Sequence, residues 1–326
     1  MLILSEADLK QILTIREVIE AVETGFQSLF QGEALAPERL NLAIPSQNAV
    51  LLEMPSRIES ASQTLLGTKI VSVFPANVAK NLDIVQGLYL LLDGETGKPL
   101  ALMEGKFITA MRTAAASALA TRLMMSEGKK TLGVFGAGVQ ARFHIEAMVE
   151  VASIEKIFIA SRTIEKAERL AEFVEAAYRI PCDVMSADEV AESSDLICTC
   201  TNSSEPLFEG RLLQAGCHIN AIGAFTPRMR ELDSLAVKRA RVIIDAHTAA
   251  GAEAGDLLIP IAEGAINPTH IQGTLAEVVA GKIRGRASAN EITLFKSCGL
   301  AIEDLVTAQL AYEKAQIKGI GTRITF

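Results

Sequence analysis

The segment GVFGAGVQARFH, residues 133–144, contains the residues of this sequence whose types and spacing point most directly to chemistry. Gly136, Gly138 and Ala141 follow a G-x-G-x-x-A spacing between an apolar strand and an amphipathic helix. The first glycine permits a tight turn, the second lets the backbone approach a pyrophosphate, and the alanine allows close helix packing. The helix N-terminus favours phosphate charge. The segment therefore predicts a dinucleotide site and redox chemistry.

The end of the next expected strand bears on which dinucleotide binds. Dinucleotide-binding units for NAD usually place an acid there, about 20 residues beyond the glycines, for the ribose hydroxyls. This chain has Ser161, Arg162 and Thr163 instead, and the first acid is Glu165. A guanidinium and hydroxyls can receive a 2′-phosphate, which a carboxylate would repel. We expect NADP(H) to be preferred, with NAD(H) as the alternative if Arg162 is only a solvated side chain.

Two basic side chains lie in apolar or small-residue surroundings. Lys69 occurs in LLGTKIVSVF, where strand alternation puts it on one face with Val71 and Val73. This pattern fits a sheltered ammonium with a chemical task, and equally a lysine that snorkels at a sheet rim. Arg112 occurs in ITAMRTAAASALA, whose small residues would let a ligand approach or let helices pack closely.

The sequence contains no motif for metal binding, nucleophilic catalysis or a P-loop. The four histidines and five cysteines show no metal-ligand spacing and no C-x-x-C, and no nucleophile-elbow or P-loop motif occurs. An odd number of cysteines without a disulfide pattern is typical of a reduced intracellular protein. We therefore expect no metal, and a cytoplasmic location because MLILSEADLK does not resemble a secretory signal.

The amino-acid composition argues against some classes of binding partner. The 326 residues carry a net charge of −8, with 21% charged and 49% hydrophobic residues. This balance is ordinary for a globular protein and argues against nucleic-acid binding. No apolar run reaches membrane-spanning length, so we expect no membrane association.

The elements that must position these residues fall into two groups. Thr14 and Glu17 form a capping box before a helical pattern that ends at Gly32, and strands are expected at 50–55, 65–74, 87–93 and 98–105. From residue 109 onward a small-residue helix precedes strands that alternate with helices. The first group predicts an antiparallel or mixed sheet, and the second predicts a doubly wound parallel sheet. A strong helix is expected at 297–316.

Six motifs in register resemble the ornithine cyclodeaminase/mu-crystallin family over nearly the whole chain. They are KIVSVFPAN, AMRTAAASALA, GVFGAGVQA, NAIGAFTPRMRELD, the GD at 255–256 and FKSCGLAIED. The resemblance implies a homodimer in which a Rossmann domain, residues 113–297, is inserted in an α+β substrate and dimerisation domain. That second domain would comprise residues 1–112 and the C-terminal segment 298–326.

The resemblance also implies site residues. Arg39, Lys69 and Arg112 match family residues that hold the substrate carboxylate, with Lys69 and Arg112 expected to be catalytic. We add Phe225 and Cys298 to the expected substrate-binding set. The cofactor contacts implied by the family or by the glycine turn are Thr113, Gly136, Gly138, Val139, Gln140, Ser161, Arg162, Thr163, Thr201, Ala221, Ile222, Gly223 and Ser297.

One position departs from the cyclodeaminase pattern. Cyclodeaminases carry GGD, whose aspartate handles the substrate amine, whereas this chain reads GAF at 223–225. The phenyl ring of Phe225 cannot accept a hydrogen bond from an ammonium or move a proton. The segment resembles the reductase and crystallin branch of the family instead.

The sequence therefore supports one favoured hypothesis and three alternatives. The favoured function is reduction of cyclic α-imino acids, Δ1-pyrroline-2-carboxylate or Δ1-piperideine-2-carboxylate, to L-proline or L-pipecolate. An alanine dehydrogenase-type enzyme would need the same cations and room for ammonia. Ornithine cyclodeamination is disfavoured by Phe225, and a non-catalytic ligand-binding protein like mu-crystallin is the remaining alternative. In each case the partner is a small α-imino or α-amino acid.

Overall fold

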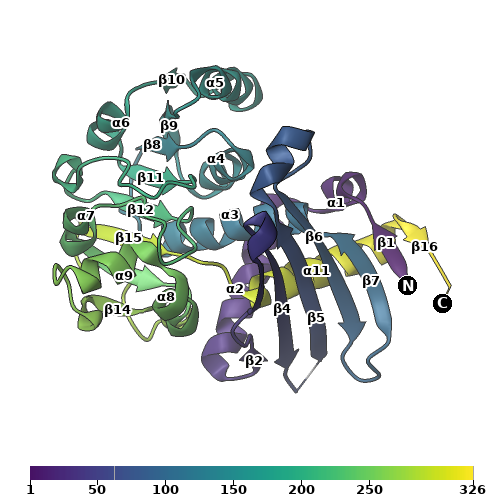
Figure 1. Cartoon of the computed structure of the whole chain (residues 1–326). Coiled ribbons are helices and arrows are strands. Elements are labelled where there is room, and N and C mark those ends of the chain that lie inside the picture. Colours follow the sequence, from purple (N-terminus) through teal and green to yellow (C-terminus); the bar gives the residue numbers. More distant parts are fainter. Residues whose placement is uncertain (62, 326) are drawn as a thin grey trace. The chain divides into compact units, whose positions relative to one another are not determined.

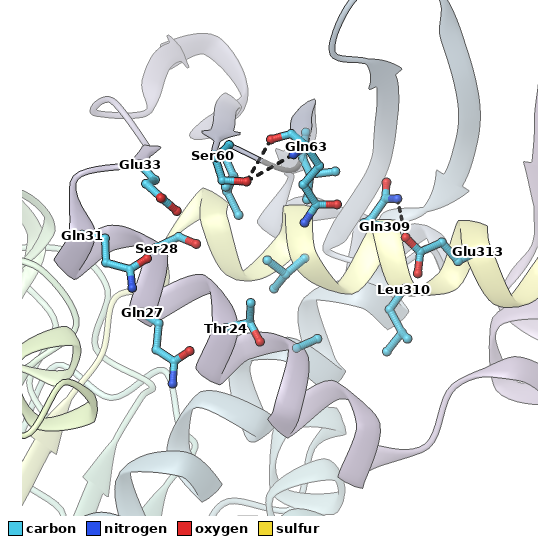
Figure 2. Close-up of a pocket in the computed structure, with 15 residues that line it drawn as sticks. Thr24, Gln27, Ser28, Gln31, Glu33, Ser60, Gln63, Gln309, Leu310 and Glu313 are labelled. Atoms are coloured by element: carbon cyan, nitrogen blue, oxygen red, sulfur yellow. Dashed lines mark hydrogen bonds between the residues drawn. The ribbon is translucent and has the colours of Figure 1, made fainter.

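The computed structural model describes residues 1–61 and 63–325 and divides the chain into two compact units (Figure 1). The first unit is Met1–Arg112 with Leu300–Phe326, and the second is Thr113–Gly299. The first boundary falls at the expected residue, and the chain returns to the first unit two residues after the expected position. Residue 326, the end of the expected C-terminal segment, lies outside the described residues.

The first unit is built on a mixed sheet, in agreement with the sequence pattern. Its main path runs in the order β16-β1-β7-β6-β5-β4-β2, and β3 pairs with β4. β1 and β7 are parallel, while β4 to β7 form an antiparallel meander. The bounds are β1 Leu2–Leu4, β2 Ala34–Leu35, β3 Leu40–Ile44, β4 Ala49–Glu59, β5 Thr64–Val73, β6 Val85–Asp93, β7 Pro99–Glu104 and β16 Thr322–Arg323.

Helices cover one face of this sheet. α2 (Ile15–Gln31) starts at the Thr14 capping box and ends at Gly32, which has a left-handed φ of 77°. α11 (Ala301–Lys318) packs against β4, β5, β6 and α2 (Figure 1). α1 spans Glu6–Ile12, and the 3-10 helices η1 and η2 span Pro45–Gln47 and Pro75–Lys80. Because α11 lies against β5, the inward side chains of that strand, Lys69 among them, are buried.

The second unit contains a parallel sheet of Rossmann type. Its strand order is β10-β9-β8-β11-β12-β15-β13-β14, and every pairing is parallel. The order reverses between β8 and β11, which is the switch point where doubly wound sheets bind dinucleotides. The strands are β8 Lys130–Phe135, β9 Ile154–Ala160, β10 Cys182–Val184, β11 Leu196–Thr199, β12 His218–Ala221, β13 Ala240–Ile244, β14 Ile271–Thr274 and β15 Ile292–Lys296.

Helices follow most strands of the second unit, as the alternation predicts. α3 (Gly105–Met124) begins in the first unit and continues into the second, and it starts four residues before the expected helix. The other helices are α4 Val139–Val151, α5 Ile164–Tyr178, α6 Ala187–Ser193, η3 Gly210–Leu212, α7 Ser234–Arg239, α8 His247–Glu253, α9 Gly255–Ala262, η4 Pro268–His270 and α10 Leu275–Val279.

Candidate active site

The glycine-rich turn leaves β8 and opens α4. Gly136 has a φ of +109°, and a Cβ there would lie 2.7 Å from the carbonyl oxygen of Cys200, so both conformation and space require glycine. Gly138 is the N-cap of α4, and a Cβ added to it would meet no described atom within 4 Å. Ala141 is completely buried. Exposed backbone at a helix N-terminus fits a pyrophosphate, so these residues fit a dinucleotide.

The segment after β9 is where the adenosine ribose of a dinucleotide would lie in this fold. Arg162 is exposed there, and its Nη2 donates to Oδ1 of Asn202 at 3.2 Å. The backbone N–H of Thr163 donates to the Ser161 hydroxyl at 3.2 Å, and Thr163 is the N-cap of α5. The segment thus presents one guanidinium and two hydroxyl groups where an NAD-binding unit usually has a carboxylate.

Thr201, Ala221–Gly223 and Ser297 lie at the carboxyl ends of β11, β12 and β15, whereas Val139 and Gln140 begin α4 and Thr113 lies in α3. Asp245, which is almost completely buried, holds the segment after β15. One oxygen of its carboxylate accepts from the Ser297 hydroxyl at 3.1 Å and from the backbone N–H groups of Cys298 and Gly299 at 2.6 and 2.8 Å. Phe225 follows β12 and is 39% exposed.

The first unit contains a buried cluster of charged side chains. Lys69 of β5 places its Nζ 2.8 Å from Oδ2 of Asp304. Arg112 of α3 donates from Nε to Oδ1 of the same carboxylate at 3.1 Å and from Nη1 to Oε2 of Glu303 at 2.7 Å. Lys69 is 2% exposed and Arg112 5%, while both acids are inaccessible. Asp304 therefore joins the two cations that the sequence singles out.

The electrostatics of this cluster favour a lysine that can exchange its proton near neutral pH. Burial and the Arg112 charge lower the pKa of Lys69 to about 8, although Asp304 opposes them and Arg39 adds to them. Tyr89, the neighbour of Lys69 on β6, is completely buried, and burial together with Asp304 raises the pKa of its phenol. The ammonium rather than the phenol is the group suited to proton transfer here.

The structure brings together some of the expected substrate residues. Lys69 and Arg112 meet at Asp304, and the half-buried Arg39 is close enough for its charge to lower the pKa of Lys69. Phe225 and Cys298 belong to the second unit. Sequence reasoning missed Glu303 and Asp304, because two acids in the first turn of a helix are ordinary partners of the helix dipole.

Two further properties concern the described residues as a set. Within residues 1–61 and 63–325, no three His, Cys, Asp or Glu side chains are grouped so that they could hold a metal ion. No helix in that part of the chain has both the length and the apolar character needed to cross a membrane.

The parallel sheet with its glycine turn defines a dinucleotide-binding protein of the doubly wound class, joined to a unit that buries an ionic cluster. The chain belongs to the ornithine cyclodeaminase/mu-crystallin family, whose model matches residues 1–319. This confirms the resemblance drawn from the six motifs.

Relatives of this chain match it over its whole length. A Δ(1)-pyrroline-2-carboxylate reductase of Bacillus cereus strain ZK / E33L is 38% identical over 328 aligned residues, with 100% of both chains covered. A solved structure of Thermococcus litoralis Δ(1)-pyrroline-2-carboxylate reductase in complex with NADH and L-proline is 43% identical, with a TM-score of 0.96 and coverage of 99% and 100%. An archaeal alanine dehydrogenase dimer with bound NAD is 32% identical, with a TM-score of 0.94 and coverage of 100% and 99%.

Proposed function

We propose that this chain is an NAD(P)H-dependent reductase of cyclic α-imino acids, which converts Δ1-pyrroline-2-carboxylate to L-proline and Δ1-piperideine-2-carboxylate to L-pipecolate. The buried cation cluster carries the proposal. Lys69 and Arg112 meet at the Asp304 carboxylate, and the Arg39 charge is close enough to lower the pKa of Lys69. Such a group of cations suits a substrate that carries a carboxylate, and the names of the reductase relatives support a cyclic imino acid as that substrate.

The cluster can bind and protonate such a substrate. The two acids fix the plane of the Arg112 guanidinium, and a fixed guanidinium suits the paired hydrogen bonds of a carboxylate. Lys69 adds a second positive contact and can hold or give a proton near neutral pH. The reduced nicotinamide supplies hydride for the C=N carbon when it is bound. One hydride and one proton convert the imine to the amine.

An alanine dehydrogenase-type reaction is the second candidate, because the archaeal alanine dehydrogenase matches the whole chain. It would use the same cations for an open-chain 2-oxo acid and would also need ammonia. Cyclodeamination of ornithine is disfavoured, because Phe225 offers no acid for the substrate amine.

A substrate panel tests the proposed function. We expect oxidation of NADPH or NADH with Δ1-pyrroline-2-carboxylate and Δ1-piperideine-2-carboxylate, followed as the loss of nicotinamide absorbance. Pyruvate with ammonia should react much more slowly, and L-ornithine with oxidised cofactor should yield no proline above background. Faster turnover of pyruvate with ammonia would replace the proposal by the second candidate, and robust proline formation from ornithine would require a base other than residue 225.

We further propose that the enzyme prefers NADPH to NADH, on the strength of the exposed Arg162 and its neighbouring hydroxyls. The Thermococcus litoralis reductase and the archaeal alanine dehydrogenase were solved with NADH and NAD, so the preference for NADPH has to be measured on this chain itself. Arg162→Asp should lower kcat/KM for NADPH by about ten- to hundredfold, because a charge-assisted bond contributes about 1.5–3 kcal/mol and the new carboxylate repels the 2′-phosphate. Comparison of kcat/KM for NADPH and for NADH, in the wild type and the variant, measures this change in preference.

Arg169→Asp is the matched control for this substitution. Arg169 is exposed on α5 of the same unit, so its replacement makes the same charge change away from the ribose segment. It should leave the ratio of the two cofactors unchanged. A wild-type enzyme that favours NADH would refute the interpretation of Arg162.

We infer that the chain forms a homodimer through the outward face of the first sheet. On this face Leu40 and Leu42 of β3, Ile70 of β5 and Leu88 of β6 are 42–55% exposed. The intervening strand β4 pairs Leu51 with Leu42 and Glu53 with Leu40. Several large apolar side chains exposed on one face of a sheet favour an interaction surface there. The dimeric archaeal relative supports the inference.

A further inference from the structure

The loop after β11, Cys200–Ser203, is tied to three parts of the cofactor-binding unit. The Cys200 carbonyl oxygen lies against Gly136 of the glycine turn, and Asn202 accepts the hydrogen bond of Arg162. The remaining tie is Thr201, whose backbone N–H and hydroxyl both donate to Oε1 of Glu231 at 2.7 Å. Glu231 is completely buried and lies in the segment between β12 and α7.

The other oxygen of Glu231 holds the loop after β12. Oε2 accepts from the backbone N–H groups of Gly223 and Ala224 at 2.7 and 3.2 Å, and from the Thr199 hydroxyl at 2.7 Å. The two loops are in direct contact, since a Cβ on Gly223 would overlap the carbonyl oxygen of Thr201. One carboxylate therefore fixes the carboxyl ends of two neighbouring strands relative to each other.

The buried ion pair of Lys296 and Asp256 holds the backbone at Glu231. Lys296 at the end of β15 donates to Oδ2 of Asp256 at 2.9 Å and to the carbonyl oxygen of Ala224 at 2.6 Å. The other oxygen of Asp256 accepts from the backbone N–H groups of Glu231 and Leu232 at 2.7 and 3.0 Å. Burial and Asp256 raise the pKa of Glu231, and Lys296 opposes them. With donors directed at both of its oxygens, the ionised form is the one that these contacts fit.

The place of these loops in the sheet indicates which half of the cofactor they face. In a doubly wound fold the pyrophosphate lies at the turn after the first strand, and the adenosine ribose lies at the end of the next strand in sequence. These are β8 and β9. β11 and β12 lie on the opposite side of β8 from β9, which is the side left for the nicotinamide. Glu231 itself has its carboxylate occupied by protein donors, so it acts through the loops.

We propose that Glu231 is a positioning residue for the nicotinamide half of the cofactor, acting through the Thr201 and Gly223 loops that its carboxylate holds together. This inference rests on the proposed use of a nicotinamide dinucleotide but not on the identity of the imino acid. Glu231, a buried acid outside the substrate cluster, would thereby fix the position of the nicotinamide ring that carries the hydride.

Glu231→Gln tests the proposal by binding rather than by turnover. The amide would direct N–H donors at backbone N–H groups, so one of the two loops would lose its acceptor. We expect the Kd of NADPH to rise by about tenfold or more. The Kd of 2′-phospho-ADP-ribose, which lacks the nicotinamide, should change less than twofold. Titration calorimetry on the full chain measures both values, and neither depends on which substrate is reduced.

Two further variants make the result decisive. Asp195→Asn is the matched control, because Asp195 also ties two strands through Thr131, at the amino ends of β8 and β11. It should leave the ratio of the two Kd values unchanged. Glu231→Asp keeps the charge but is too short to reach both loops, so it should show the same selective loss and serves if Glu231→Gln does not fold. An equal loss for both ligands, or no loss for either, would overturn the proposal.

Discussion

Lys69→Ala should lower kcat for Δ1-pyrroline-2-carboxylate by about a hundredfold or more, because a positioned proton donor contributes about 10²–10⁴ to a rate. The ammonium is 2% exposed and lies 2.8 Å from Asp304, and burial together with Arg112 lowers its pKa to about 8. Affinity for NADPH, measured by the fluorescence of the bound cofactor, should change little. Steady-state kinetics with saturating NADPH give kcat directly.

Two variants separate loss of the proton donor from loss of packing. Lys69→Met keeps a long unbranched side chain and should lose activity as Lys69→Ala does. Lys106→Ala removes a lysine of α3 that is half exposed and paired with Asp83 and Glu104, and it should leave kcat near the wild-type value. A near-normal kcat in both Lys69 variants would show that the proton comes from elsewhere.

The pH dependence follows from the same geometry. If the ammonium gives the proton, kcat should fall as pH rises through about 8, since the neutral amine has no proton to give. Asp304 raises the pKa of Lys69, so Asp304→Asn should move this alkaline limb to lower pH. A limb that stays in place in Asp304→Asn would separate the pH profile from Lys69.

Local sequence patterns were sufficient for much of the fold. The glycine turn and the alternation of strands with helices predict a doubly wound parallel sheet with a dinucleotide site, because turn geometry and periodicity depend on neighbours in sequence. The α2 helix was predicted with both ends, since a capping box and a left-handed glycine define them locally.

Features that depend on distant contacts were not predicted. β15 lies between β12 and β13, although it follows β13 and β14 in sequence. No local pattern states which strand a late strand will pair with. The short strands β1 and β16 pair the beginning of the chain with its end, and strands of two or three residues are too brief for alternation to reveal.

The candidate site shows the same division. Alternation correctly puts Lys69 on the buried face of its strand, but only the fold brings Asp304, more than 200 residues later in sequence, to its side chain. Glu231 is a comparable case. From the sequence alone an acid in an irregular segment is expected to be solvated, whereas in the structure its carboxylate accepts five hydrogen bonds. Partners of buried charges are set by tertiary contacts, so such acids escape sequence analysis.

The other large effect concerns the substrate anchor. Arg112→Lys should raise KM for Δ1-pyrroline-2-carboxylate by about ten- to hundredfold, because loss of a charge-assisted bond of about 1.5–3 kcal/mol corresponds to that range. A lysine keeps the positive charge but loses the planar pair of donors that matches a carboxylate. It also loses the geometry with which the guanidinium meets both Glu303 and Asp304.

Arg122→Lys is the control that isolates this loss, because Arg122 is exposed on the same helix and the substitution is the same. Its KM should stay within twofold of the wild type. NADPH binding in Arg112→Lys can change somewhat, since the adjacent Thr113 is an expected cofactor contact. The selective signature is therefore a KM for the imino acid that rises far more than the Kd of NADPH. Near-normal KM in Arg112→Lys would mean that the substrate carboxylate binds outside the Lys69–Arg112–Asp304 cluster.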